Sequence, residues 1–183
     1  MNVFFIMDIT PLNNQEVFDY YYDISPKTRK EKADRLKICE DKARCIGVYA
    51  LLRFAVGDYT PYNLDNLEIL TDNNGKPYVK NNPFYFSLAH SGKYAVCALS
   101  DTQVGIDIEL EKEFPPKFKD RFAENTLEWT KKEAKGKLTG NGFFDKTPDR
   151  FVYTHKKTDG YIITVCSDKC FEDFYTYHLP FPT

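Results

Sequence analysis

The chain has 183 residues and a net charge of −2, with 42% hydrophobic and 28% charged residues. This length allows one well-packed core, or two small lobes that share a core. The composition is that of a soluble globular protein, and the slight negative charge argues against a dedicated nucleic-acid binder. No apolar run approaches the roughly 18 residues of a membrane-spanning helix, so we expect neither nucleic acid nor membrane as a partner.

The cysteines also limit the class of protein. Their number is odd and their spacing matches neither a disulfide nor a zinc framework, the five being Cys39, Cys45, Cys97, Cys166 and Cys170. Three of them lie within apolar patterns, which predicts buried free thiols. Free thiols persist in a reducing compartment, so we expect a cytoplasmic protein.

The N-terminal part predicts a strand and then a long helix. The start "MNVFFIMDI" lacks the basic region of a signal peptide and soon meets Asp8, so residues 3–9 are interpreted as a strand. From Lys27 to Gly57, apolar residues recur at spacings of three or four with charged residues opposite them, which predicts a helix.

Short strands and turns follow. A strand is expected near 67–71, and "TDNNGKPYV" is typical of a hairpin turn. The stretch "PFYFSLAHSGKYAVCALS" predicts strands at 84–88 and 94–100, joined by a polar turn at His90-Ser91-Gly92.

The second half repeats this order of elements. A strand at 104–110 precedes a helical stretch, for which Asn125 or Thr126 is a candidate N-cap and Gly140 a candidate stop. A hairpin is expected around Asp159-Gly160. The sequence therefore predicts an α+β fold of two similar lobes, residues 1–102 and 103–183.

The strand "VGIDIEL" carries the first candidate site. Its aliphatic residues alternate with Gly105, Asp107 and Glu109, so both carboxylates lie on one face. Like charges in such a position repel unless water or a cation screens them. Hard cations such as Mg²⁺ bind carboxylate oxygens, and Gly105 is expected to leave room for a ligand. A plain solvent-facing acidic strand is the alternative.

The stretch "EWTKKEAKGKLTGNG" is the second candidate. On a helix, Trp129, Glu133 and Lys137 share one face at spacings of four. The alternative is a surface ion pair between Glu133 and Lys137, which stabilises a helix by only about 0.3–0.5 kcal/mol.

Basic residues and two turns form the remaining candidates. Residues 26–44 hold a local excess of lysine and arginine, which suits a small polyanion. The turns Gly75-Lys76-Pro77 and His90-Ser91-Gly92 offer cations and N–H groups that suit phosphate. A solvated helix face and a structural histidine are the alternatives. With the acidic residues, these cations describe a site for a metal-bridged diphosphate that bears a further phosphate.

The motifs together resemble a known family. "VGIDIE" followed by "WTKKEAKGKLTGNG" resembles the two signature motifs of the 4'-phosphopantetheinyl transferases. "GKP" and "HSG", upstream and in that order, resemble additional motifs of the larger surfactin-synthetase-activating (Sfp-like) subfamily. The resemblance spans roughly residues 25–142.

The resemblance implies a role for each matching residue. Asp107, Glu109 and Glu133 would hold Mg²⁺ against the diphosphate of coenzyme A, and Glu133 would also take the proton from a carrier-protein serine. Lys137 would neutralise the leaving 3',5'-ADP, with Lys132 a weaker candidate. Coenzyme A would meet Arg29, Lys32, Arg44, Lys76, Pro77 and His90, with His90 at the 3'-phosphate.

The resemblance also implies a fold and partners. The fold would be a pseudo-dimer of two α+β lobes with coenzyme A between them, and we expect a monomer. The second substrate would be an apo acyl, polyketide or peptidyl carrier protein. Two departures stand out: Ala89 replaces a usual serine, and only 19 residues separate Glu109 from Trp129. A non-catalytic coenzyme A-binding protein that has lost carrier docking is the alternative.

The short segment 111–125 is the candidate docking region. Phe114, Phe118 and Phe122 recur at a spacing of four, which favours core packing over a docking surface. The cations between them, Lys117, Lys119 and Arg121, are expected to meet a carrier, because carriers tend to be acidic near their modified serine.

Overall fold

The computed structural model describes residues 1–180 and confirms a mixed α+β fold within them. The elements follow in the order β1 (Asn2–Asp8), α1 (Gln15–Asp23), α2 (Lys27–Asp34), α3 (Cys39–Tyr59), β2 (Ile69–Thr71), β3 (Pro77–Val79), β4 (Tyr85–Ser91), β5 (Tyr94–Ser100), β6 (Val104–Leu110), α4 (Pro116–Lys119), α5 (Thr126–Thr139), β7 (Val152–Thr158), β8 (Tyr161–Ser167) and β9 (Asp173–His178). Short 3₁₀ turns lie at Thr10–Asn13 and Leu64–Asn66.

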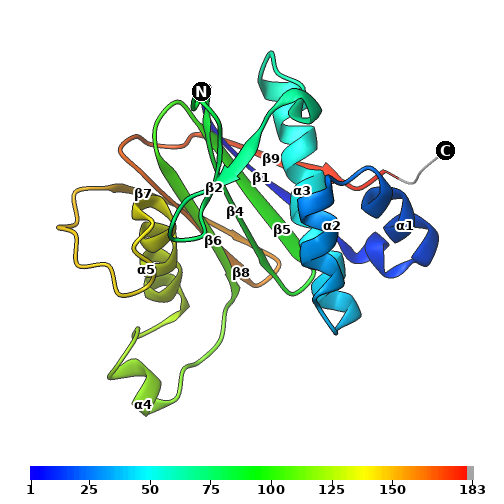
Figure 1. Ribbon diagram of the computed structural model, residues 1–183. Helices are drawn as coiled ribbons and strands as arrows, with labels where there is room; N and C mark the ends of the chain where they lie inside the picture. Colours follow the sequence, from blue (N-terminus) through cyan, green and yellow to red (C-terminus); the bar gives the residue numbers. More distant parts are fainter. Residues whose placement is uncertain (181–183) are drawn as a thin grey trace.

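Two sheets with the same connectivity organise the chain (Figure 1). One has the order β4-β5-β1-β9 and the other the order β6-β8-β7, with β2 and β3 as a separate hairpin. β1 is antiparallel to β5, which pairs with its hairpin neighbour β4, and in the same way β6 is antiparallel to β8, which pairs with its hairpin neighbour β7. β9 returns from the C-terminal half to lie parallel to β1. The division at residues 102 and 103 stays a prediction.

The sheets and the two long helices form layers. Phe5 and Leu99 on one face of the first sheet are buried against Ile46 and Leu51 of α3. Val96, on the opposite face, joins a buried cluster that includes side chains of β6 and β8. α5 covers the outer face of the second sheet (Figure 1). Each such apolar side chain contributes roughly 1.5–3 kcal/mol on burial, so this layered core holds β6 and α5 rigidly.

The elements around the candidate site match their predictions closely. β6 spans residues 104–110 as expected, with Val104, Ile106 and Ile108 unexposed. Asn125 caps α5 by accepting a hydrogen bond from the Glu128 N–H at 3.0 Å. Gly140 ends the helix with a φ of 77°, a left-handed conformation that glycine adopts without strain.

Other elements differ from their predictions. The helix expected from Lys27 to Gly57 is two helices, because the chain is extended at Ile38 between α2 and α3. Glu40 and Asp41 in the first turn of α3 favour a new helix N-terminus there. α1 and β9 had no counterpart in the predicted elements. α1 is nine residues long, and its buried residues Val17 and Tyr21 lie four apart, a helical signal that the predicted elements missed.

The thiols are arranged as expected. Cys45, Cys97 and Cys166 are buried, Cys39 and Cys170 are exposed, and all five are free. Within residues 1–180, no helix combines the length and the apolar character that crossing a membrane requires.

Candidate active site

β6 presents its carboxylates to α5. Gly105 lies on the same face, but the space beside it is already filled: a Cβ there would lie 1.9 Å from the carbonyl oxygen of Ala134. The expectation that Gly105 leaves room for a ligand is therefore wrong. Its missing side chain instead lets the backbone of α5 pack directly onto β6, which brings Asp107 close to the side chains of the helix.

Asp107 is a buried carboxylate with one partner. Its Oδ1 accepts a hydrogen bond from the Lys137 ammonium at 2.7 Å, and its side chain is 9% exposed. Within residues 1–180, its Oδ2 is buried and accepts no hydrogen bond. Burial raises the pKa of Asp107 above its ordinary value, and the charge of Lys137 opposes that rise. An unpaired buried carboxylate oxygen is costly, which makes it a natural ligand for a cation.

Glu109 and Glu133 complete an acidic cluster with Asp107. Ser91 donates a hydrogen bond to Glu109 at 3.2 Å. Burial, followed by the charge of Asp107, raises the pKa of Glu109. The same two causes, in the same order, raise the pKa of Glu133, and Glu109 adds to them. The three carboxylates are thus close enough to repel one another, which is the condition that a bound cation would relieve.

The acidic cluster fits a cation that is shared with a substrate. Within the described residues, no three His, Cys, Asp or Glu side chains form a ready-made metal cage. Mg²⁺ does not need one, because it usually keeps water and substrate phosphates beside one or two carboxylates. The free Oδ2 of Asp107 and the hard oxygen donors of this cluster suit such an ion.

A basic hollow adjoins the acidic cluster. It has a volume of about 420 Å³ and lies between α2, α3 and β4. Five of the predicted site residues line it: Arg29, Lys32, Pro77, His90 and Lys137. Burial lowers the pKa of His90, and the charges of Arg44, Lys137 and Lys32 lower it further. The positive charge around the hollow thus disfavours protonation of His90 and attracts an anion.

Arg44 stands beside the basic hollow and does not line it. Its guanidinium bonds to Asp41 at 2.6 Å and to the carbonyl oxygen of Gly92 at 3.4 Å. Its charge acts on the hollow from outside and helps to lower the pKa of His90.

A second hollow lies at the end of α5. This helix-end hollow has a volume of about 270 Å³, and its lining includes Lys76, Pro77, Glu133, Gly136, Lys137, Gly140 and Gly142. Pro77, Leu88 and Lys137 line both hollows, so the two adjoin. The Lys76 ammonium donates to the carbonyl oxygens of Leu138 at 2.9 Å and of Val104 at 3.4 Å. Lys76 therefore ties the β2–β3 hairpin to α5 and β6.

Lys132 lies on another side of α5. Its ammonium donates to the carbonyl oxygen of Phe122 and lies 5.8 Å from the ring centroid of Phe143. It lines a third hollow of about 520 Å³ whose lining includes Arg121, Lys131 and Phe144 but none of the three clustered carboxylates. The structure does not bring Lys132 to the acidic cluster, and its role in transfer stays a prediction.

The segment 111–125 folds onto α5. Phe114, Phe118 and Phe122 surround Trp129, with ring centroids 5.2–6.4 Å from it. Phe114 is buried, so the stripe packs as expected. Lys117, Lys119 and Arg121 stay exposed at its surface.

Two contacts of the site had no signal in the sequence pattern. Ser87 accepts a hydrogen bond from the Ile106 N–H at 3.1 Å, which fixes β4 beside β6. Asp145 holds the turn after α5 through its side chain. Both depend on contacts between distant segments or within an irregular loop, which periodicity does not report.

The arrangement defines a class of protein. A buried acidic cluster shares Lys137 with a basic hollow, so a ligand with several phosphates can lie across both. Glu133, with its raised pKa, is a carboxylate that can accept a proton beside that ligand. These are the parts of an enzyme that transfers a phosphate-bearing group.

Comparison with curated proteins identifies the family. The chain is 30% identical over 160 residues to the 4'-phosphopantetheinyl transferase psf-1 of Bacillus pumilus, a match that covers 75% of this chain and 69% of that protein. It is 29% identical to the 4'-phosphopantetheinyl transferase Sfp of Bacillus subtilis (strain 168), over 69% of this chain and 56% of that protein. It is 36% identical to the 4'-phosphopantetheinyl transferase gsp of Aneurinibacillus migulanus, over 44% of this chain and 35% of that protein. No family model matches the chain.

The chain belongs to the 4'-phosphopantetheinyl transferase family of enzymes, among its Sfp-like members. It spans little more than half of the Sfp relative (56%) and about a third of gsp (35%).

Proposed function

We propose that this chain transfers the 4'-phosphopantetheine group of coenzyme A to a serine of an acyl, polyketide or peptidyl carrier protein and releases 3',5'-ADP. The observation that carries the proposal is the position of Lys137. It pairs with Asp107 and also lines both hollows, so it joins the acidic cluster to the phosphate-binding surface. Membership of the family supplies the reaction that this geometry suits.

Coenzyme A lies across the two adjoining hollows. Arg29 and Lys32 supply positive charge for its 3'-phosphate, His90 can donate a hydrogen bond to it, and Arg44 adds to the field from beside them. Pro77, which lines both hollows, borders the adenine. The backbone and stem of Lys76 lie there too, while its ammonium holds α5 in place. The two halves are the lobes of a pseudo-dimer, a proposal that their matching strand order supports.

Glu133 is the general base. The serine hydroxyl gives its proton to Glu133 while its oxygen forms a bond to the β-phosphorus of coenzyme A. The bond from that phosphorus to the departing 3',5'-ADP breaks, and Lys137 balances the charge that the leaving phosphate gains. A raised pKa makes Glu133 a better proton acceptor than an ordinary glutamate. Mg²⁺, held by Asp107, Glu109 and Glu133, supplies further charge stabilisation when it is bound.

The carrier docks beside α5. The exposed cations Lys117, Lys119 and Arg121 lie on the segment that packs against Trp129, one helical turn from Glu133. They are placed to attract an acidic partner whose serine must reach that glutamate. We propose that the chain acts as a monomer in the cytoplasm, in keeping with its free thiols.

A non-catalytic coenzyme A-binding protein is the second candidate. Two features favour it: segment 111–125 is short, and Ala89, which lines the basic hollow, has no hydroxyl for a phosphate. Calorimetry with coenzyme A and the intact mass of an apo carrier after incubation with Mg²⁺ and coenzyme A distinguish the two. A carrier that gains the phosphopantetheine mass supports the enzyme, whereas binding without any mass gain supports the second candidate.

A further inference from the structure

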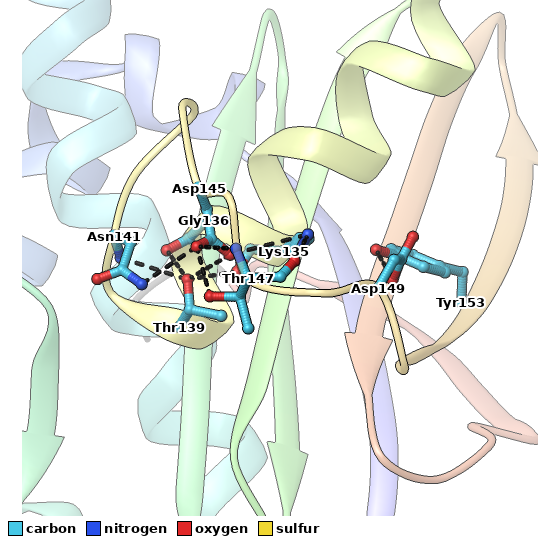
Figure 2. A network of polar contacts seen from close by, with 8 residues as sticks. All are labelled: Lys135, Gly136, Thr139, Asn141, Asp145, Thr147, Asp149 and Tyr153. Atoms are coloured by element: carbon cyan, nitrogen blue, oxygen red, sulfur yellow. Dashed lines mark hydrogen bonds and ion pairs between the residues drawn. The ribbon is translucent and has the colours of Figure 1, made fainter.

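The turn that follows α5 is held by a single buried carboxylate, Asp145 (Figure 2). Its side chain is 2% exposed and accepts hydrogen bonds from both ends of the turn. Thr139 donates to it at 3.1 Å and Asn141 at 3.1 Å. Thr147 donates twice, through its hydroxyl at 2.6 Å and its N–H at 3.0 Å. The Lys135 ammonium lies 4.0 Å away and also donates to the Thr147 carbonyl oxygen at 2.5 Å.

These contacts keep Asp145 charged. Burial alone would raise its pKa, but the hydrogen bonds from Thr147, Asn141 and Thr139 outweigh burial and lower the pKa to about 2. A carboxylate in this state accepts charge-assisted hydrogen bonds, which are about twice as strong as neutral ones. The turn is thus fixed from within.

The fixed turn folds back onto the helix that carries the site. The Gly142 N–H donates to the carbonyl oxygen of Gly136 at 3.3 Å. A Cβ on Gly136 would lie only 2.3 Å from the carbonyl oxygen of Gly142, so the two backbones touch without side chains between them. Gly140 and Gly142 line the helix-end hollow together with Lys76, Glu133 and Lys137.

Asp145 does not line the helix-end hollow itself. It faces the third hollow, on the other side of the turn. Its effect on a ligand must therefore pass through the position of Gly140 and Gly142. We propose that Asp145 is a positioning residue that sets the width of the helix-end hollow and thereby determines how tightly coenzyme A is held. This inference rests on the proposed function, because it assigns coenzyme A to that hollow.

The decisive variant is Asp145→Asn, which keeps the size of the side chain but turns one acceptor into a donor that faces Thr139 and Lys135. Asp149→Asn is its matched control. Asp149 lies on the same loop, is exposed, and within residues 1–180 accepts a hydrogen bond only from the Tyr153 hydroxyl, at 2.9 Å (Figure 2). Its substitution therefore removes the same charge without touching the turn. Asn141→Ala is a milder variant that removes one donor from an exposed position.

We expect Asp145→Asn to weaken the binding of coenzyme A without changing the KM for the carrier. In Asp145→Asn, the dissociation constant of coenzyme A by calorimetry and its KM should both rise about tenfold, the factor that 1.4 kcal/mol represents. The carrier KM should stay at the wild-type value, and kcat should change less than about threefold. Asn141→Ala should weaken coenzyme A binding about threefold, and Asp149→Asn should leave it unchanged. General loss of structure would lower kcat and affect both substrates together.

The outcomes separate this inference from the proposed function. If the wild type neither binds coenzyme A nor modifies a carrier, the proposed function fails. If the wild type does both, and Asp145→Asn and Asn141→Ala bind coenzyme A as tightly as it does, the role of Asp145 is refuted. If Asp145→Asn does not fold, Asn141→Ala decides alone: unchanged binding refutes the inference and weakened binding supports it.

Discussion

At the scale of single residues, the proposed transfer depends on Glu133 and the groups that raise its pKa. Replacing Glu133 by glutamine removes the base but keeps the shape of the helix face. We predict that transfer falls at least about a hundredfold, because a general base contributes roughly 10²- to 10⁴-fold. Coenzyme A binding should remain, as calorimetry can check. A variant that retains more than a tenth of wild-type turnover would remove Glu133 from the mechanism.

The pH dependence of transfer follows from the same residue. Burial and the charge of Asp107 raise the pKa of Glu133, and a protonated Glu133 cannot accept the serine proton. Transfer should therefore rise as the pH increases through the pKa of Glu133, and the midpoint should fall as the Mg²⁺ concentration increases, because Mg²⁺ bound to Glu133 would lower that raised pKa. A midpoint that does not respond to the Mg²⁺ concentration would contradict this assignment.

A third residue-scale prediction concerns the 3'-phosphate of coenzyme A. Because Lys32 and His90 line the basic hollow, coenzyme A should bind more tightly than its 3'-dephospho form. A charged hydrogen bond contributes roughly 1.5–3 kcal/mol. Lys32→Ala should narrow the difference in affinity between the two ligands. Lys37→Ala, at an exposed position outside the hollow, should leave that difference unchanged. Equal affinity of the wild type for both ligands would show that the basic hollow is assigned wrongly.

The preference for coenzyme A over its 3'-dephospho form should also depend on pH, because His90 can be protonated. Burial and nearby cations lower the pKa of free His90, and a bound phosphate would raise it again. The preference for coenzyme A should therefore grow as the pH falls through the pKa of His90 in the complex. In His90→Gln the preference should lose most of its pH dependence between pH 5 and 8.

At the scale of elements, Lys76 connects the β2–β3 hairpin with the end of α5. Lys76→Met keeps the stem but leaves the Leu138 carbonyl oxygen without its donor. The free energy of unfolding should fall by about 1–3 kcal/mol, the cost of an unsatisfied buried acceptor. Lys80→Met, an exposed change on the same hairpin, should lower the free energy of unfolding much less, because an exposed ion pair contributes little. Equal denaturation midpoints for wild type and Lys76→Met would show that the Lys76–Leu138 hydrogen bond contributes nothing to stability.

The segment 111–125 gives a prediction about the carrier. Reversing Lys117 and Lys119 to glutamate should raise the apparent KM for the carrier and leave coenzyme A affinity unchanged, because exposed charges act mainly on association. The rate of carrier modification by this variant should also lose its dependence on salt concentration, since salt screens the attraction that the two lysines provide in the wild type. If the carrier kinetics do not respond to salt concentration in either the wild type or the variant, the docking surface lies elsewhere on the molecule. The tail "FEDFYTYHLPF" is one place, although its last residue, at 181, lies outside the described residues.

Elements with a clean period were predictable, and those that depend on distant contacts were not. β6 alternates strictly and α5 has both a cap and a glycine stop, so their bounds followed from local signals. β9 is exposed along much of its length and is defined by pairing with β1, some 170 residues earlier in the chain. The Asp145 network combines residues of an irregular loop, which has no period. The strand period predicted that Asp107 and Glu109 share a face, whereas the position of Glu133 beside them depends on the packing of α5 onto β6, which the family resemblance implied and the period did not.

At the scale of the whole molecule, the site lies where the two halves meet. β6 and α5 come from the second half, whereas the basic hollow is built largely from α2, α3 and β4 of the first. Lys137 pairs with Asp107 inside the second half and also lines the basic hollow of the first, so packing of the halves places the other cations of that hollow beside this pair. The buried cluster that Phe4 and Ile6 form with Ile106 and Ile163 maintains that alignment.

The most direct test of the central claim counts both products in one reaction. Wild-type chain, Mg²⁺, coenzyme A and an apo carrier are incubated, and 3',5'-ADP and the intact mass of the carrier are measured together, with Glu133→Gln as the control. We expect each carrier to gain one phosphopantetheine group and one 3',5'-ADP to appear for each modified carrier, with Glu133→Gln at least about a hundredfold slower. Coenzyme A that binds to the wild type while neither product forms would contradict it.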